Sequence, residues 1–133
     1  MLRVTGYNAS GAKVGRDQSD APFTIEVVRL TAPSDPGISV TFGDTYDISW
    51  TRNVTVNPVE KVVLYYTKNA TATPIIWKQI ASFRVAKYPG TFPWEVPLLP
   101  VTETKCKVKV VLMDARGVIV GSDVSDSYFT IQP

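Results

Sequence analysis

The 133 residues of this chain are enough for one domain with a buried core, and its fractions of hydrophobic (44%) and charged (20%) residues are those of a folded protein rather than a disordered one. The formal net charge of +2 is too small to predict nucleic acid as a partner, and no apolar run approaches the ~20 residues of a membrane span. With no histidine and one cysteine, Cys106, the chain has no internal disulfide and lacks the commonest catalytic base.

The N-terminal 26 residues repeat the C-terminal end of the chain. Residues 14–25 read VGRDQSDAPFTI and residues 120–131 read VGSDVSDSYFTI, and the match extends back to Val4 over Val110 at a constant offset of 106. Eleven of the 22 aligned positions are identical, which indicates a tandem repeat. We therefore predict two parts: residues 1–26 form a hairpin from the last two strands of a preceding repeat, and residues 27–133 form one complete repeat.

Residues 27–133 alternate apolar and polar side chains in short segments, which predicts an all-β fold. The alternation is strict in residues 45–51, with Tyr46, Ile48 and Trp50 on one face, and in residues 105–110, where three lysines point outward. The strands that we predict lie near residues 24–31, 38–42, 45–51, 60–67, 74–81, 91–96, 104–113 and 118–131. About seven to eight antiparallel strands of this length suit a β-sandwich of ~100 residues.

Glycines mark the turns and the irregular points of both copies. Asp114-Ala115-Arg116-Gly117 predicts a hairpin turn whose glycine takes a positive φ, and Asn8-Ala9-Ser10-Gly11 keeps the same chemistry in the first copy. Gly121 and its twin Gly15 lie inside a strand and predict a bulge. The first copy ends at Ile25 and the next strand begins almost at once, so we expect neighbouring repeats to stand end to end with little hinge freedom.

Several of these segments resemble the immunoglobulin- or fibronectin III-like tandem repeats of large exported bacterial and archaeal surface proteins. The matching segments are Pro33–Gly37, Ile48–Trp50, Tyr66–Asn69, Trp77, Phe92–Pro97 and Ser125–Ile131. The hairpin after Tyr66 lacks the usual pair of glycines. The resemblance spans residues 27–131 and implies an immunoglobulin-like antiparallel sandwich, in which residues 1–26 supply part of strand F and strand G of the preceding unit.

The resemblance also implies a function. Repeats of this kind are non-catalytic spacer, display or adhesion modules outside the cell or on its surface, and they carry no cofactor. The expected partners are the neighbouring repeats of the same chain and a cell-surface protein or polysaccharide. The alternative is a carbohydrate-binding or accessory module of a secreted enzyme. Because an isolated hairpin is marginally stable, we expect the N-terminal hairpin to pack on the edge of the domain or on another copy.

The residues that could carry chemistry have simpler structural explanations. Cys106 faces inward on a strand and has no histidine to activate it, so we expect a buried core thiol rather than a nucleophile. Asp114, Asp123 and Asp126 suit turns and bulges better than a calcium site, which needs six to eight oxygen ligands. We therefore predict neither catalytic nor metal-binding residues.

Exposed aromatic rings are the remaining candidates for ligand contact. Tyr65 points away from the core face of its strand and Tyr88 lies near a strand end, so either ring could stack on a sugar. Trp50, Trp77 and Trp94 occupy positions that are structural in the resembled repeats, so we expect their side chains to be buried.

Two further patterns also have ordinary explanations. The outward lysines at 105, 107 and 109 are more typical of a solvated strand face than of a surface that binds a polyanion. The sequons at Asn8, Asn53 and Asn69 fall in predicted turns, where glycan acceptors occur, but a chain rich in threonine also produces them by chance.

Overall fold

The computed structural model describes residues 3–18, 26–53, 55 and 57–133, and all regular structure in this part of the chain is β-strand. An N-terminal hairpin consists of β1 (Arg3–Tyr7) and β2 (Lys13–Gln18). The remaining strands are β3 (Val28–Ala32), β4 (Ser39–Thr41), β5 (Thr45–Arg52), β6 (Lys61–Thr67), β7 (Lys78–Arg84), β8 (Thr91–Glu95), β9 (Glu103–Met113), β10 (Ile119–Val124) and β11 (Phe129–Gln132). In the described residues, no helix is long and apolar enough to cross a membrane.

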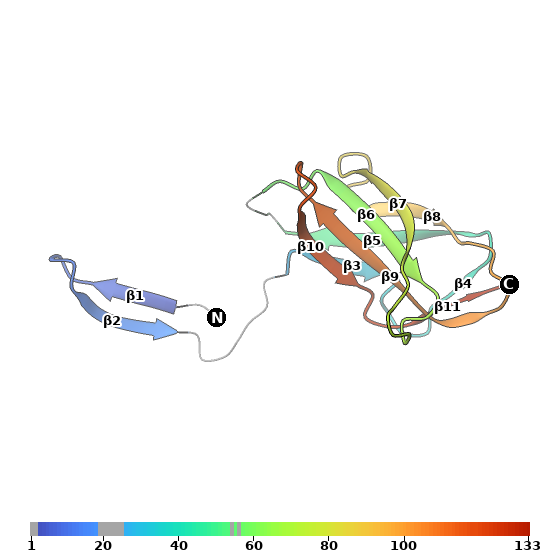
Figure 1. The fold of residues 1–133 in the computed structure, drawn as a ribbon, viewed down its shortest axis with the longest axis horizontal. Coiled ribbons are helices and arrows are strands. Elements are labelled where there is room, and N and C mark those ends of the chain that lie inside the picture. Colours follow the sequence, from blue (N-terminus) through green and yellow to red (C-terminus); the bar gives the residue numbers. More distant parts are fainter. Residues whose placement is uncertain (1–2, 19–25, 54, 56) are drawn as a thin grey trace.

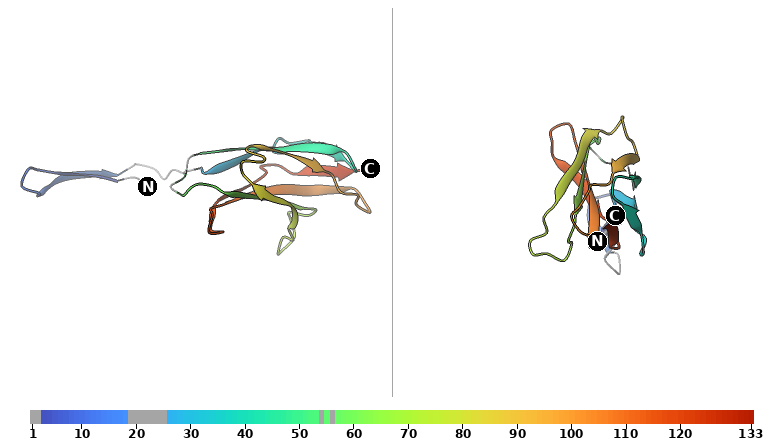
Figure 2. Two further views of the ribbon diagram at one scale, coloured as in Figure 1. Left: turned by 90° about the horizontal axis from the view of Figure 1, so that it is seen from above. Right: turned by 90° about the vertical axis from the view of Figure 1, so that its right-hand side faces the viewer.

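Two sheets pack face to face as the predicted sandwich (Figures 1 and 2). The larger sheet has the order β4-β11-β9-β6-β7, and β10 pairs with the second half of β9. The smaller sheet has the order β3-β5-β8. The strands pair antiparallel except β11 with β4, which run parallel.

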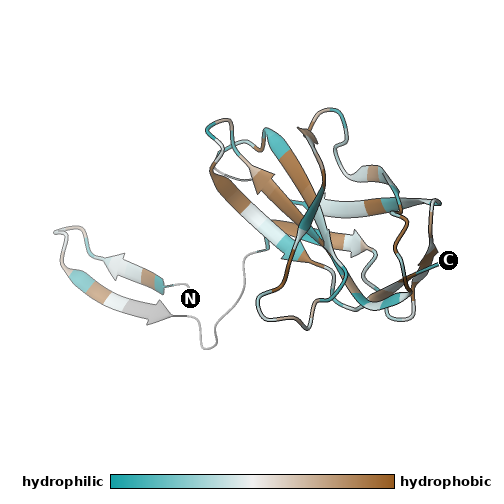
Figure 3. Ribbon diagram, turned by 45° about the vertical axis from the view of Figure 1, so that its right-hand side comes forward, coloured by the Kyte–Doolittle hydropathy of each residue, from teal (hydrophilic) through white to brown (hydrophobic). Residues whose placement is uncertain are grey.

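The core lies between the two sheets and follows the predicted alternation. In the small sheet, Ile48 and Trp50 of β5 and Trp94 of β8 are buried. In the large sheet, the inward residues of β9 are fully buried: Cys106, Val108, Val110 and Leu112. The Trp94 ring lies edge-on to Phe129 of β11 at a centroid distance of 6.2 Å, which joins the two layers. Figure 3 shows apolar bands on the strands of both layers.

The eight predicted strands are present, but two begin later than expected. The strand predicted near residues 24–31 begins at Val28, and residues 24–25 lie outside the described part of the chain. The strand predicted over residues 74–81 begins at Lys78. The chain leaves the sheet after Thr67, where Asn69 forms a turn. The Asn69 side-chain oxygen accepts a hydrogen bond from the Thr71 amide at 3.0 Å, and Asn69 bridges to Lys105 of β9. Pairing with β6 resumes only where Lys78 lies opposite Tyr66.

The predicted last strand, residues 118–131, is divided into β10 and β11. Ser125 ends the first part by bonding both backbone groups of Val108: its amide donates to the Val108 carbonyl at 2.9 Å, and its hydroxyl accepts from the Val108 amide at 3.0 Å. The chain then bends, and β11 pairs with both β4 and the start of β9. The predicted bulge at Gly121 is confirmed by a register shift between Ile119 and Gly121.

The hairpin β1–β2 reproduces the pairing of β9–β10. Val4 lies opposite Asp17, as Val110 lies opposite Asp123, and Gly6 lies opposite Gly15, as Leu112 lies opposite Gly121. The shift in register falls at the same place in both hairpins. The two copies thus share a backbone register as well as a sequence.

The turns of the two hairpins are also equivalent. The Asn8 side-chain oxygen accepts hydrogen bonds from the amides of Ser10 at 3.1 Å and Ala12 at 2.9 Å. The Asp114 carboxylate accepts from the amides of Arg116 at 2.9 Å and Val118 at 3.0 Å. The glycine that closes each turn has the predicted positive φ, 82° at Gly11 and 79° at Gly117.

The hairpin lacks the second sheet that covers its twin. Val4 is 64% exposed and Val14 is 65% exposed, whereas Val110, the twin of Val4, is completely buried. In Figure 1 the hairpin stands clear of the sandwich. Within the described part of this chain, nothing covers the apolar side chains of the hairpin.

The chain enters and leaves the sandwich at opposite ends (Figure 1). At the start, the Val27 carbonyl accepts a hydrogen bond from the Asn53 amide at 2.9 Å, and Val27 fills the space beside Gly121. A Cβ atom at Gly121 would lie 2.7 Å from Val27, so this contact requires glycine. At the finish, the Gln132 carbonyl accepts from the Phe42 amide at 2.8 Å.

The Asp114 turn gives a testable pH dependence. The Val118 amide, the Arg116 side chain and the Arg116 amide together hold the pKa of Asp114 below its usual value of 3.8. A carboxylate with a lowered pKa in the folded state adds stability that is lost as the pH falls through that pKa. Asp114→Asn keeps the acceptor that Asn8 supplies in the first copy, whereas Asp114→Ala removes it.

We expect thermal unfolding at neutral pH to rank the native chain above Asp114→Asn and Asp114→Asn above Asp114→Ala. The gap between native and Asn should close in strong acid, while Ala should stay lower throughout because two amides have lost their acceptor. A native-to-Asn gap that is the same at every pH contradicts this account.

Candidate functional site

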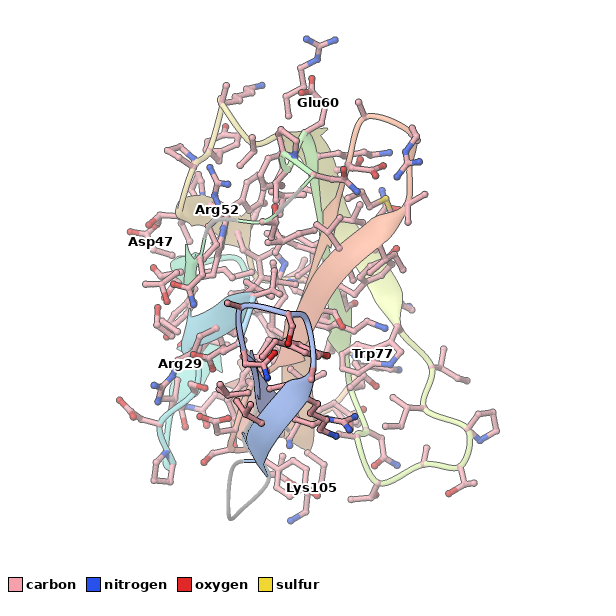
Figure 4. The ribbon with its side chains drawn as sticks, turned by 90° about the vertical axis from the view of Figure 1, so that its left-hand side faces the viewer. Arg29, Asp47, Arg52, Glu60, Trp77 and Lys105 are labelled. Atoms are coloured by element: carbon pink, nitrogen blue, oxygen red, sulfur yellow. The ribbon has the colours of Figure 1, made fainter. Side chains whose placement is uncertain are left out.

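The outer face of the large sheet gathers aromatic rings and lysines. Tyr65 of β6 lies opposite Lys109 of β9, and Trp77 comes just before β7. The Lys109 ammonium nitrogen is 5.0 Å from the centre of the Tyr65 ring and 4.5 Å from that of Trp77. Figure 4, seen from the hairpin end, places Trp77 on the opposite side of the molecule from Arg29 and Asp47 of the small sheet.

A second group continues along the same strand. The Lys105 and Lys107 ammonium nitrogens lie 4.6 Å and 5.1 Å from the centre of the Tyr128 ring. Tyr128 comes from the bend between β10 and β11 and is 39% exposed. We name the six side chains Tyr65, Trp77, Lys105, Lys107, Lys109 and Tyr128 the lysine–aromatic face.

The ammonium groups of these lysines lie near aromatic rings rather than near carboxylates. In the described residues, the ion pairs are Arg84 with Glu60 and Arg116 with Asp114, and neither includes a lysine. Burial lowers the pKa of Lys109, as expected for an ammonium group held between two rings. Each such contact contributes about 0.5–1 kcal/mol at an exposed site.

This face also has an apolar floor. Val63 of β6 lies opposite Val111 of β9, both point away from the core, and both are almost completely buried. Residues on the outside of a sheet are buried in this way when longer neighbouring side chains lie over them. The prediction that the lysines at 105, 107 and 109 point outward is confirmed by their contacts with rings outside the core.

A shallow concavity of about 390 Å³ adjoins the lysine–aromatic face. It is lined by Thr67, Lys68, Asn69, Ala72, Ile76 and Lys78, from the end of β6, the adjoining loop and the start of β7. Thr67 lies opposite Lys107, which places this hollow beside the lysine row. A small polar ligand with apolar faces, such as a sugar, could contact both surfaces.

The two tyrosines predicted as ligand contacts lie in different environments. Tyr65 belongs to the lysine–aromatic face. Tyr88 instead packs edge-on against Phe83 at 5.0 Å and Phe92 at 5.1 Å, in a cluster that joins the main core. The structure does not bring the two rings into one surface.

The three tryptophans also lie in two different environments. Trp50 and Trp94 are buried in the core, as expected. Trp77 is only partly buried and lies on the outer face against Lys109, so the expectation that it belongs to the core is wrong. Sequence reasoning missed its pairing with Tyr65, because residue 77 reaches Lys109 only through the ordering of β6, β7 and β9.

Two acidic residues of the C-terminal copy accept hydrogen bonds from backbone amides. Asp123 accepts a hydrogen bond from the Leu30 amide at 2.7 Å and so ties β10 to β3 of the other sheet. Asp114 organises its turn. In the described residues, no three acidic or cysteine side chains gather as metal ligands.

Cys106 lies in the core with its sulfur 3.5 Å from the Glu103 carbonyl oxygen. Burial raises the pKa of its thiol to about 11. Since the thiolate is the reactive form, the side chain is poorly suited to nucleophilic attack at neutral pH.

Thiol labelling tests this assignment. At pH 8 we expect an aromatic disulfide reagent to leave the native chain unmodified and to label one thiol fully after denaturation, because the sulfur is both inaccessible and protonated. A surface variant, Ser82→Cys, provides the positive control for the reagent. Rapid labelling of the native chain at Cys106 contradicts a buried core role.

The environments of Tyr65 and Tyr88 predict different costs of truncation. Tyr88→Ala removes a ring from a packed aromatic cluster, and we expect a loss of about 2 kcal/mol or more of unfolding free energy. Tyr65→Ala removes a ring that contacts lysine at the surface, so the expected loss is about 1 kcal/mol or less. Urea unfolding measures both. Equal losses contradict the separation of core and surface roles.

No protein-family model matches this sequence, and no curated protein matches it significantly. A solved structure described as fibronectin(III)-like modules of Clostridium thermocellum CbhA is similar to it, with a TM-score of 0.53 and 13% sequence identity. The similarity covers 98% of this chain, hairpin included, and 60% of that chain. At this identity the likeness establishes the fold, a fibronectin III-like β-sandwich preceded by a hairpin.

Proposed function

We propose that this chain is a non-catalytic spacer, display or adhesion module from a tandem array in an extracellular or cell-surface protein. The observation that carries the proposal is the position of the two chain ends. The chain enters beside Gly121 and leaves beside Phe42, at opposite ends of the long axis (Figure 2). A module joined in this way adds its full length to a stalk.

The N-terminal hairpin supports the array. We propose that residues 1–26 are part of strand F and strand G of a preceding repeat and that residues 27–133 are the complete unit. The shared register of β1–β2 and β9–β10, with the bulge in the same place, supports this division. So does the exposure of Val4 and Val14, since the rest of a preceding sandwich, or another copy of the chain, would cover them.

The described side chains favour a structural role over catalysis. Cys106 has a raised pKa and no open position for a substrate. The three aspartates near the C-terminus lie in turns or beside strand ends, where Asp114 and Asp123 bond backbone amides. The similarity to fibronectin(III)-like modules of CbhA supports the fold on which this role rests.

The alternative is a carbohydrate-binding or accessory module of a secreted enzyme. Tyr65 and Trp77 favour it, because they lie together on an outer face beside a hollow. Lys109 already lies against both rings, so a sugar would have to displace its ammonium group or stack on their free sides. Loss of glycan binding in Tyr65→Ala but not in Lys109→Met would support this alternative.

A two-unit chain tests the spacer role. A second copy of residues 28–133 is joined directly after Pro133, which continues the 106-residue offset. In small-angle X-ray scattering, we expect the maximum dimension to grow by about the length of one sandwich, because each unit begins where the last one ends. A compact chain with the two units folded side by side contradicts the proposal.

A further inference from the structure

Strand register sorts the loops of the sandwich into two ends. β9 runs from Glu103, opposite Ile131 near the C-terminus, to Met113, opposite Ile119 near the point where the chain enters. The loop between β8 and β9 therefore lies at the C-terminal end of the sandwich. The β9–β10 turn lies at the N-terminal end (Figure 1).

Four of the seven large exposed hydrophobic side chains of the described sandwich lie in these two loops. Leu98 (79% exposed) and Val101 (58%) lie in the β8–β9 loop, and Val118 (51%) and Ile119 (59%) lie at the β9–β10 turn. The other large exposed hydrophobic residues of the sandwich are Ile75, Ile76 and Tyr128. A pair of exposed apolar side chains at each end is a surface that a neighbouring unit would cover.

Leu98 and Val101 lie close to the point where the chain leaves. The loop that carries them begins at Val96, whose carbonyl accepts from the Gly43 amide at 2.9 Å. The neighbouring Phe42 amide donates to the Gln132 carbonyl at 2.8 Å. The last strand and this loop are therefore held to the same turn.

The repeat offset places the next unit directly beyond this surface. In a chain continued at an offset of 106, Gln132 and Pro133 take the places of Glu26 and Val27. Those residues are held to their own unit, since the Glu26 carbonyl accepts from the Asn53 side-chain amide at 2.6 Å. Two residues span at most ~7 Å, so the next unit begins within contact distance of this one.

We propose that adjacent units dock end to end, with Leu98 and Val101 of one unit packed on Val118 and Ile119 of the next. This inference rests on the proposed array and adds the surface that stiffens it. A concavity of about 320 Å³ lies at the same N-terminal end as Val118 and Ile119, lined by Asn57, Pro58, Glu60, Asp114, Ala115 and Arg116. Burying these side chains favours one fixed angle between units.

The test uses the full chain joined directly to a second copy of residues 28–133. Residual dipolar couplings report whether both units share one alignment tensor, which they do when they tumble as one body. We expect a shared tensor in this chain. Leu98→Ser with Val101→Ser in the first copy should abolish it, because that end faces the junction.

The matched control places the same two substitutions in the second copy, where the C-terminal end has no further unit beyond it. We expect this control to keep the shared tensor. Val118→Ser with Ile119→Ser in the second copy should also abolish it, which tests the other side of the junction. Thermal unfolding of each variant confirms that the units themselves remain folded.

Separate tensors in the unsubstituted chain overturn the inference, and so does equal behaviour of the junction and control variants. Either outcome leaves the proposed spacer role standing if scattering still shows an extended chain. A compact chain in scattering is instead the failure of the proposed function.

Discussion

Strand β9 is the element on which the rest of the structure depends. It pairs with β6, β10 and β11, so these strands of the large sheet are held together through it. Its inward residues from Cys106 to Leu112 are completely buried and form the large-sheet side of the core. A polar side chain at any of these positions would lose its hydration without gaining a hydrogen-bond partner. The alternation of apolar and polar residues along β9 therefore supplies the apolar surface on which the small sheet packs.

The same alternation produces the outer face. Lys105, Lys107 and Lys109 point outward because the residues between them point in, and each meets an aromatic ring from another element. Val63 and Val111, which also point outward from the large sheet, are almost completely buried. This face is thus largely satisfied by its own side chains, which favours a structural module over an open sugar platform.

The repeated residues of the C-terminal copy hold the start of the sandwich in place. Gly121 leaves room for Val27, and the Asp123 carboxylate accepts a hydrogen bond from the Leu30 amide, so the start of the sandwich is tied to β10. Their twins Gly15 and Asp17 recur in the first copy with the same register. In the proposed array, this attachment would leave few free residues between units, and the angle between them would depend on contacts between their ends.

The sequence by itself determined the β-sandwich, the inward positions of β5 and β9, both hairpin turns and the bulge at Gly121. These features follow from local chemistry: side chains alternate along a strand, and asparagine, aspartate and glycine favour particular turns. It could not divide the last strand at Ser125, because that break depends on Val108, which is distant in sequence.

Only the tertiary structure separated Tyr65 from Tyr88 and placed Trp77 beside Lys109. Whether an aromatic ring lies on the surface or in the core depends on which strand lies next to it. Strand order is a property of the whole fold. The two apolar ends became visible for the same reason, since Leu98 and Val118 are ordinary loop residues until register assigns them to opposite ends. The sequence determined what each segment is, whereas tertiary packing decided what each segment meets.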